Sequence, residues 1–317
     1  MTEIVRPPAD ADNLVAQVSW LQSLIKFSRT KPLGAIGFVI VAAYILTAIF
    51  ADFIAPMDPL DVDYELLNAL PSAAHLLGTD DIGRDLLSRL IYGARTAMLV
   101  GFVSSLVGAT IGLFIGVASA YFGGIVDLIA QRVVDVFISF PLIILALAIV
   151  TIVPAVTADM FLPEPLQWLW PEIFGTTLPV IVAITIPMIP RCARVVRSSA
   201  LALREVPYVD AARALGFSHL RIIMRHMVPN VMAPYLIMLT AFMGQAVLLE
   251  ASLSYLGLGV SEPTPAWGLM LQGSAEQYFR SAPHAAIIPG LAITMSVFAF
   301  NVFGDSLRDV LDPRLRV

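Results

Sequence analysis

The chain has 317 residues, of which 58% are hydrophobic and 14% are charged, with a mean hydropathy of +0.83 and a net charge of −5. This composition excludes an ordinary water-soluble domain, and the acidic balance gives no support to nucleic acid as a partner. The single cysteine, Cys192, excludes an intrachain disulfide or a cysteine-based metal cluster, and the four histidines show no metal-ligand spacing.

Six apolar windows predict six transmembrane helices, since about 20 apolar residues are needed to cross the hydrocarbon core. The windows, which lack Asp, Glu, Lys and Arg, are Pro32–Ala51, Thr96–Val126, Val136–Ala158, Ile173–Pro190, Met227–Leu249 and Ala285–Gly304. The first window is longer than the hydrophobic region of a cleaved signal peptide, so we interpret it as an uncleaved anchor. We expect an all-α polytopic membrane protein.

Basic residues predict the orientation, because cytoplasmic loops carry an excess of Lys and Arg. With six spans, fifteen of the nineteen basic residues fall on the side of the two termini, and the other four are Arg84, Arg89, Arg95 and Arg280. Both termini are therefore expected in the cytoplasm, as tails at 1–31 and 307–317. Between them we expect a first transmembrane helix at 32–55, an external segment at 56–92 and a five-helix core at 93–306. That core would include a cytoplasmic loop at 191–228 and an outer lid at 250–283.

The cytoplasmic loop contains the most informative local pattern. Pro207 suits a first helical turn, Asp210 favours the positive end of a helix, and Gly216 is a natural C-terminal stop. Ser218 can cap a second helix, which continues to Pro229. The pattern predicts a helix–glycine–helix elbow, and periodicity alone favours its interpretation as an amphipathic connector on the membrane surface.

This loop resembles the coupling loop of ABC importer permeases. The residues Asp210-Ala211-Ala212, then Gly216, then His226-Met227-Val228-Pro229 match the family pattern Glu-Ala-Ala…Gly…Ile-x-Leu-Pro in spacing, with Asp, His and Val as departures. The resemblance implies that the loop docks into a groove of a cytoplasmic ATPase. The residues to which it assigns this role are Glu205, Tyr208, Asp210, Ala211, Ala212, Gly216, Phe217 and Pro229.

Three further stretches resemble the dipeptide, oligopeptide and nickel importer permeases, in particular the second, C-type permease of their pair. They are the stretch from Leu77-Gly78-Thr79-Asp80 to Gly93-Ala94-Arg95, Glu250-Ala251-Ser252-Leu253-Ser254-Tyr255-Leu256-Gly257-Leu258-Gly259, and Asn301-Val302-Phe303-Gly304-Asp305 with Leu311-Asp312-Pro313-Arg314. The resemblance implies a type I ABC importer permease fold in the bacterial inner membrane, with the external segment in the periplasm. It also implies a second permease, two ATPase subunits and a solute-binding protein as partners.

The chain is expected to be a non-catalytic permease without cofactors. It contains no phosphate-binding loop, so ATP and Mg²⁺ would be bound by the ATPase subunits. The predicted function is import of di- or oligopeptides by alternating access, while nickel chelates, glutathione or opine-like solutes stay open as alternatives. An ion-coupled secondary transporter is the rival class, although such proteins tend to show repeats and a carboxylate at membrane depth.

Other candidate residues lie near the ends of the spans. Thr79 or Asp80 can cap a helix, and Asp85 and Arg89 have the spacing of an ion pair on one helix face. Arg132 and Asp135 also lie one turn apart, with Pro141 expected to kink the same helix. An outer gate is expected around Tyr255 and Trp267, and the alternative is that these aromatic residues only pack the lid.

Overall fold

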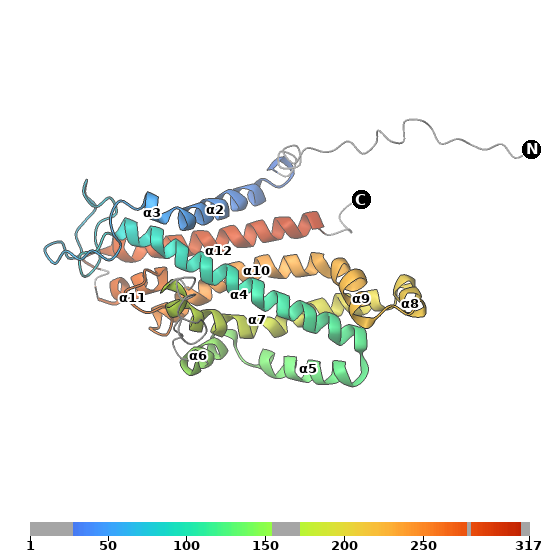
Figure 1. Cartoon of the computed structure of the whole chain (residues 1–317). Helices are drawn as coiled ribbons and strands as arrows, with labels where there is room; N and C mark the ends of the chain where they lie inside the picture. The colour runs from blue at the N-terminus through green and yellow to red at the C-terminus, as the bar shows by residue number, and fades with distance from the viewer. Residues whose placement is uncertain (1–27, 154–171, 278–279, 312–317) are drawn as a thin grey trace, which may run out of the picture.

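The computed structural model describes residues 28–153, 172–277 and 280–311, and its regular elements there are helices. Figure 1 shows long helices side by side. The first half comprises α2 (Pro32–Ile49), α3 (Ala51–Ile54), α4 (Leu86–Phe122), α5 (Gly124–Ser139) and α6 (Leu142–Ile152). The second half comprises α7 (Glu172–Arg204), α8 (Pro207–Ala214), α9 (His219–Ile222), η4 (Ile223–Met227), η5 (Val228–Val231), α10 (Met232–Tyr255), α11 (Trp267–Gln277) and α12 (Pro283–Leu311).

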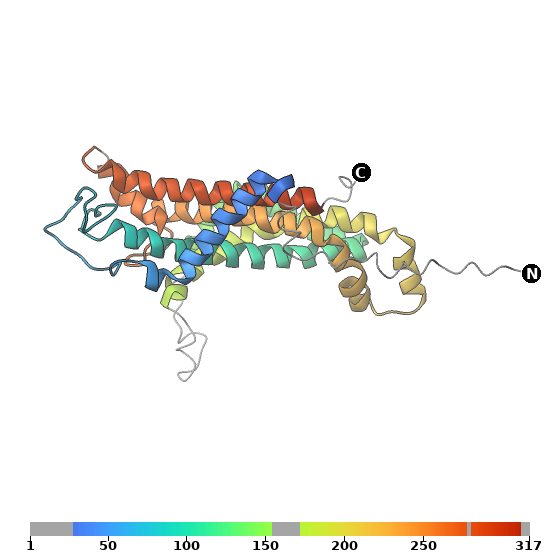
Figure 2. The same ribbon diagram turned by 90° about the horizontal axis from the view of Figure 1, so that it is seen from above.

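Five helical segments are long and apolar enough to cross a membrane, and α5 with α6 makes a sixth if this bent pair counts as one span. The prediction of an all-α membrane protein is therefore confirmed, and the predicted number of six spans is reached when the bent pair is counted as one span. Figure 2 shows that α2 lies obliquely across the bundle, where it contacts α12 and α4. The short helices α8 and α9 lie at one end of the bundle, and α11 lies at the other (Figure 1).

The third predicted span is broken rather than kinked. Between α5 and α6 the chain bends by 95°, at Phe140 and Pro141. Pro141 has no N–H to donate, and a proline disfavours the helical conformation in the residue before it. Phe140 accordingly has an extended backbone, with φ −84° and ψ 137°. The last residues of the predicted window, 154–158, lie outside the described residues.

Helix ends also differ from the predicted windows, because a charge-free window marks apolar length and not hydrogen-bonded length. The second window contains two helices, since Gly123 and Gly124 have φ of +63° and +53° and end α4 at Phe122. The segment at 191–228 does not begin as a loop, because α7 continues to Arg204. Likewise α4 begins at Leu86, inside the predicted external segment, and α10 continues into the predicted lid.

Close packing of α4 along α7 forms the centre of the bundle. A Cβ atom at Gly112 would lie 2.6 Å from Cys192 Cβ, and one at Gly116 would lie 2.6 Å from the carbonyl oxygen of Ala193. Both distances are far below a van der Waals contact, so only glycine permits this approach. Small residues four apart are the usual means by which membrane helices bring their backbones together. Cys192 is fully buried at this contact.

Candidate functional site: the elbow between α7 and α10

The candidate site is the elbow, which we define as residues 205–231 between α7 and α10. Its first helix, α8, begins with Pro207 at the first position and carries Asp210 in its first turn, as the sequence predicts. The Asp210 carboxylate forms an ion pair of 3.1 Å with Arg213 one turn later. Glu205 precedes α8 with a side chain that is 81% exposed and 3.7 Å from Arg204.

Gly216 ends α8 in the conformation that the sequence predicts. Its φ is +75°, the Gly216 N–H donates to the carbonyl of Arg213 at 2.9 Å, and the Phe217 N–H donates to the carbonyl of Ala212 at 3.2 Å. This pair of hydrogen bonds is the Schellman motif, which requires a left-handed residue at its turn. Ser218 then caps α9 by accepting from the N–H of Arg221. The helix–glycine–helix elbow is therefore present.

The elbow has one face against the bundle and one that is exposed. Val209 and Ala212 of α8 are buried, and so are Ile222 and Met227 after the turn. Four large apolar residues instead face outward, namely Tyr208, Leu215, Leu220 and Met224, with Leu215 and Leu220 exposed to 73% and 70%. Ala211 and Pro229 are exposed as well. These residues are distributed along the elbow from α8 to η4, and apolar side chains exposed outside the long helices make the elbow a candidate interaction surface.

Aromatic contacts hold the two arms of the elbow together. The Phe217 ring stacks on the His226 ring at a centroid distance of 6.2 Å, and the Arg221 guanidinium lies 4.3 Å above the Phe217 ring. The Tyr208 hydroxyl donates to the His226 carbonyl at 3.3 Å, and it accepts from the side-chain amide of Asn230 at 3.2 Å. Five consecutive residues, Ile223–Met227, form a π-helical turn, a local widening frequent at functional sites.

The elbow is also attached to the end of α4. The Tyr121 hydroxyl lies 2.8 Å from Nδ1 of His219, and the Arg213 guanidinium lies 4.9 Å above the Tyr121 ring. Tyr121 is in the last turn of α4, and it is only 4% exposed. The elbow therefore has direct contacts with a helix that is not its neighbour in the chain.

Two ion pairs join α5 to α7 near the same end. Asp127 forms two 2.5 Å hydrogen bonds with Arg197, and Asp135 forms an ion pair with Arg194. The carboxylate of Asp135 thus pairs across helices and not with Arg132, its expected partner one turn away. The backbone approach of α5 to α7 brings these side chains together, which spacing within one helix does not reveal.

The predicted gate residues occupy different environments at the opposite end of the bundle. Trp267, at the start of α11, is 1% exposed, donates from Nε1 to the Leu90 carbonyl at 2.9 Å and packs edge-on against Tyr44 at 5.4 Å. Tyr255 is the half-buried last residue of α10. The contacts of Trp267 are those of a packing residue, which was the alternative, and the gate itself stays a prediction.

The predicted helix start and ion pair near Asp85 need correction. Asp85, and neither Thr79 nor Asp80, caps α4 by accepting from the Ser88 N–H at 2.8 Å. Since Asp85 is used as the cap, the Arg89 guanidinium turns to Asp80 and to Glu262, at 3.5 Å and 3.4 Å. Arg84 joins the same cluster, with hydrogen bonds to Asp80 at 2.7 Å and to Glu262 at 2.9 Å. Burial alone would lower the pKa of Arg84, but these two carboxylates outweigh burial and raise it.

Sequence reasoning did not identify Tyr121, His219 and Glu262 as parts of these sites. Tyr121 and His219 are 98 residues apart, and Arg84 and Glu262 are 178 apart, so no local pattern joins them. The contact between α4 and α7, in contrast, is indicated by a pattern in the sequence, because Gly108, Gly112 and Gly116 recur every four residues in an apolar window.

Comparison with known proteins identifies the family. Residues 108–317 match the model for the binding-protein-dependent transport system inner membrane component, and residues 19–71 match the N-terminal TM domain of oligopeptide transport permease C. The chain belongs to this family of permeases. It is thus the membrane-spanning subunit of an ABC importer, and the resemblance found in the sequence is confirmed.

Curated relatives cover nearly the whole chain. The dipeptide transport system permease protein DppC of Alkalihalophilus pseudofirmus is 35% identical over all of this chain and 97% of its own length. A putative peptide transport system permease protein of Brucella suis is 41% identical, covering 89% of this chain and 88% of its own. The glutathione transport system permease protein GsiD of Pectobacterium atrosepticum is 37% identical over 94% and 92%.

A solved structure supports the fold. The inward-facing MetNI methionine ABC transporter contains a chain of similar fold, with a TM-score of 0.50 and 21% identity over 70% of this chain and 96% of that one. This similarity confirms the predicted fold of type I ABC importer permeases.

Proposed function

We propose that the chain is one of two permease subunits in a bacterial importer for short peptides. Relatives that are named dipeptide, peptide and glutathione permeases support this substrate class, since glutathione is itself a tripeptide. In this proposal a second permease completes the translocation path, and an external solute-binding protein delivers the peptide. The protein would reside in the inner membrane, with both termini and the elbow in the cytoplasm.

The observation that carries the proposed coupling to an ATPase is the exposed apolar surface of the elbow. An ATPase groove would accommodate the elbow through Tyr208, Leu215, Leu220 and Met224, and Ala211 is small enough to permit close approach. Closure of two ATPase subunits upon ATP would press on α8, because its other face is packed on the bundle. ATP and Mg²⁺ would be bound by those subunits, so this chain would have no catalytic residues and no cofactor of its own.

Movement of the elbow would reach the transmembrane helices by three routes. The first two are the covalent connections to α7 and α10, on either side of the elbow. The third is the contact of Arg213 and His219 with Tyr121, which connects the elbow to α4. Because α4 packs along α7, these helices would move together and alternate the access of the path.

A gene deletion tests the proposed substrate. In a host without redundant importers, the deletion strain should resist a toxic phosphonodipeptide and should fail to grow on a dipeptide as the sole source of a required amino acid. Growth on the free amino acid is the control, and the wild-type gene should restore peptide uptake. Normal peptide uptake together with loss of nickel-dependent urease activity would contradict the peptide proposal and favour the nickel alternative.

A further inference from the structure

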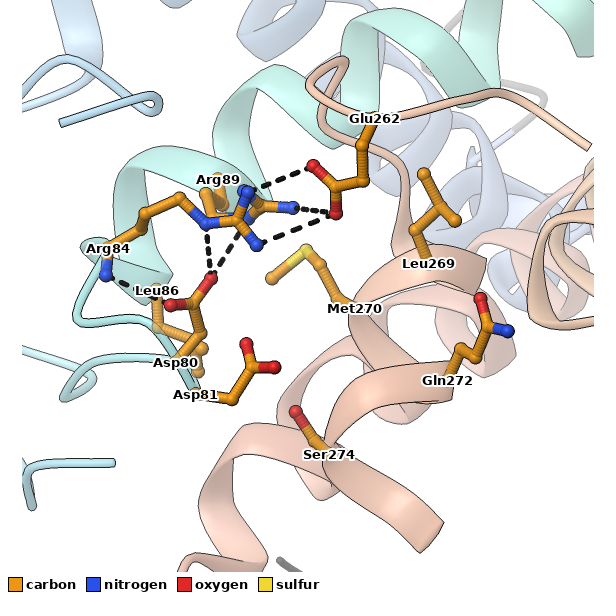
Figure 3. Close-up of a pocket in the computed structure, with 10 residues that line it drawn as sticks. All are labelled: Asp80, Asp81, Arg84, Leu86, Arg89, Glu262, Leu269, Met270, Gln272 and Ser274. Atoms are coloured by element: carbon orange, nitrogen blue, oxygen red, sulfur yellow. Dashed lines mark hydrogen bonds and ion pairs between the residues drawn. The ribbon is translucent and has the colours of Figure 1, made fainter. Parts of the chain in front are cut away.

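A cavity of about 310 Å³ lies beside the charged cluster at the end of the bundle opposite the elbow. Figure 3 shows the arginines and Glu262 at one side of this space, with Asp81, Gln272 and Ser274 around the rest of it. Three apolar side chains, Leu86, Leu269 and Met270, complete the lining. The volume is at the lower limit for small-molecule sites, which is suitable for a solute of dipeptide size.

Arg89 is one of the residues that line this cavity, and its buried guanidinium is incompletely hydrogen-bonded. Its side chain is 1% exposed, yet neither Nε nor Nη1 makes a hydrogen bond within the described part of the chain. Its closest carboxylate contacts, to Asp80 and Glu262, are long at 3.5 Å and 3.4 Å. A buried guanidinium with free donors is costly, and a carboxylate is the ligand that satisfies it best.

Glu262 is a replaceable partner of the two arginines. Its side chain is 51% exposed, and of its three contacts with them only the 2.9 Å bond to Arg84 is short. Asp80, in contrast, is only 7% exposed and also accepts from the backbone N–H groups of Ile82 and Arg84. A carboxylate that enters the cavity could therefore displace Glu262 without disturbing Asp80.

The charges around the cavity indicate which groups the ligand carries besides its carboxylate. The carboxylates of Asp80, Asp81 and Glu262 outnumber the two guanidiniums, so a multiply charged anion would be repelled. Asp81 forms no hydrogen bond or ion pair with the described residues, and it is available to an ammonium group. Gln272 and Ser274 can pair with peptide amide groups.

We propose that this cavity is a binding site for a short peptide with free ends, whose carboxylate binds Arg89 in place of Glu262 while its ammonium group binds Asp81. This inference rests on the proposed function, because it assumes that peptides pass the outer end of the permease. A small solute is favoured over a side chain of the binding protein, since a single side chain would use Arg89 and leave the polar groups of Asp81, Gln272 and Ser274 without partners.

Direct binding of dipeptides tests the site. The complete complex with the partner permease and the ATPases is placed in lipid nanodiscs without binding protein, and alanyl-alanine, its C-terminal amide and its N-acetyl form are titrated by calorimetry. The free dipeptide should bind about tenfold or more tightly than either blocked form, since each loses one charge-assisted contact. Equal affinity of the three ligands, or no binding of any of them, would overturn the proposal.

Three variants assign the residues. Glu262→Gln removes the competing carboxylate and should tighten binding of the free dipeptide, and Asp81→Asn should weaken the free dipeptide while leaving the N-acetyl form unchanged. Arg89→Gln should make the free acid and the amide bind equally. Loss of this buried charge can also impair folding, so the comparison of the three ligands is made with the unmutated complex as well. If Arg89→Gln weakens docking of the binding protein while alanyl-alanine never binds, the site receives a protein side chain and the peptide assignment is wrong. Normal peptide uptake in that event would leave the proposed transport function intact.

Discussion

The Tyr121 hydroxyl and Nδ1 of His219 lie 2.8 Å apart, and this contact joins the last turn of α4 to the elbow. The Tyr121 ring lies also beneath the guanidinium of Arg213, which belongs to α8. One side chain of α4 therefore contacts both arms of the elbow. Since α4 is 37 residues long and reaches the opposite end of the bundle, the contact connects the proposed ATPase surface to the charged cluster of Arg84, Arg89 and Glu262.

Replacing Tyr121 by Phe should weaken coupling more than folding. The ring stays beneath Arg213, while the hydrogen bond with His219 is lost at a cost of about 1 kcal/mol. We expect fewer peptides transported per ATP hydrolysed in proteoliposomes, with normal amounts of the assembled complex. Tyr121→Ala should have a larger effect, because the contact with Arg213 is lost as well.

Tyr64→Phe provides the matched control, since Tyr64 is 76% exposed in the segment at the other end of the bundle. That variant should transport as many peptides per ATP as the wild-type complex. An unchanged ratio in Tyr121→Ala would show that α7 and α10 alone transmit the movement of the elbow.

Substitutions at Gly216 can distinguish the effect of backbone strain from the effect of steric fit. A Cβ atom at Gly216 would meet no heavy atom within 4 Å, but the φ of +75° costs a β-branched residue about 1–2 kcal/mol or more. Gly216→Val should therefore disturb the end of α8 and release the ATPase subunits, while the permease keeps its level in the membrane. Copurification of the ATPases and peptide uptake measure the effect.

Asparagine tolerates the left-handed conformation, so Gly216→Asn should retain most of the transport activity. Valine and asparagine have similar side-chain volumes, but they differ in how readily they adopt the left-handed backbone conformation. If valine and asparagine behave alike, the conformation of Gly216 is not the property that coupling requires.

The orientation of the protein can be tested with introduced cysteines. Cys192 would be the native reporter, but it is fully buried against α4, so it should react from neither side. In a Cys192→Ala background, an impermeant thiol reagent should label Tyr64→Cys in intact cells and should label Leu215→Cys only in inverted vesicles washed free of ATPase. Labelling of Leu215→Cys from outside the cell would reverse the proposed topology.

Local chemistry made the elbow predictable from the sequence. Pro207, Gly216 and Ser218 act on the one or two residues beside them, and the structure has α8, its stop and the next cap at those positions. Apolar length likewise predicted six spans, the number that results when α5 and α6 are counted as one. Helix ends were less predictable, because Gly123 and Gly124 interrupt an apolar window without a charge, and because α7 continues past Arg191 to Arg204.

The contacts between distant segments were not predictable in this way. Asp127 and Asp135 pair with Arg197 and Arg194 because α5 folds back along α7. A sequence shows which charges could pair, but the choice among partners depends on how the helices are placed. The same reason explains why Arg89, expected to pair with Asp85, belongs with Glu262.

The glycines of α4 permit its close contact with α7, so replacing one of them should lower the stability of the protein. Gly112→Ala would place a methyl group 2.6 Å from Cys192 Cβ and 2.7 Å from the Ile189 carbonyl, so α4 and α7 must separate. Overpacking of this kind costs about 1–3 kcal/mol, and it should lower the thermal midpoint of the purified complex by a few degrees. Gly290→Ala on α12 is the control, since its nearest contact would be 3.9 Å away, and it should leave the midpoint unchanged or raise it. Equal thermal midpoints for the two variants would show that α4 and α7 do not pack as closely at Gly112 as the structure indicates.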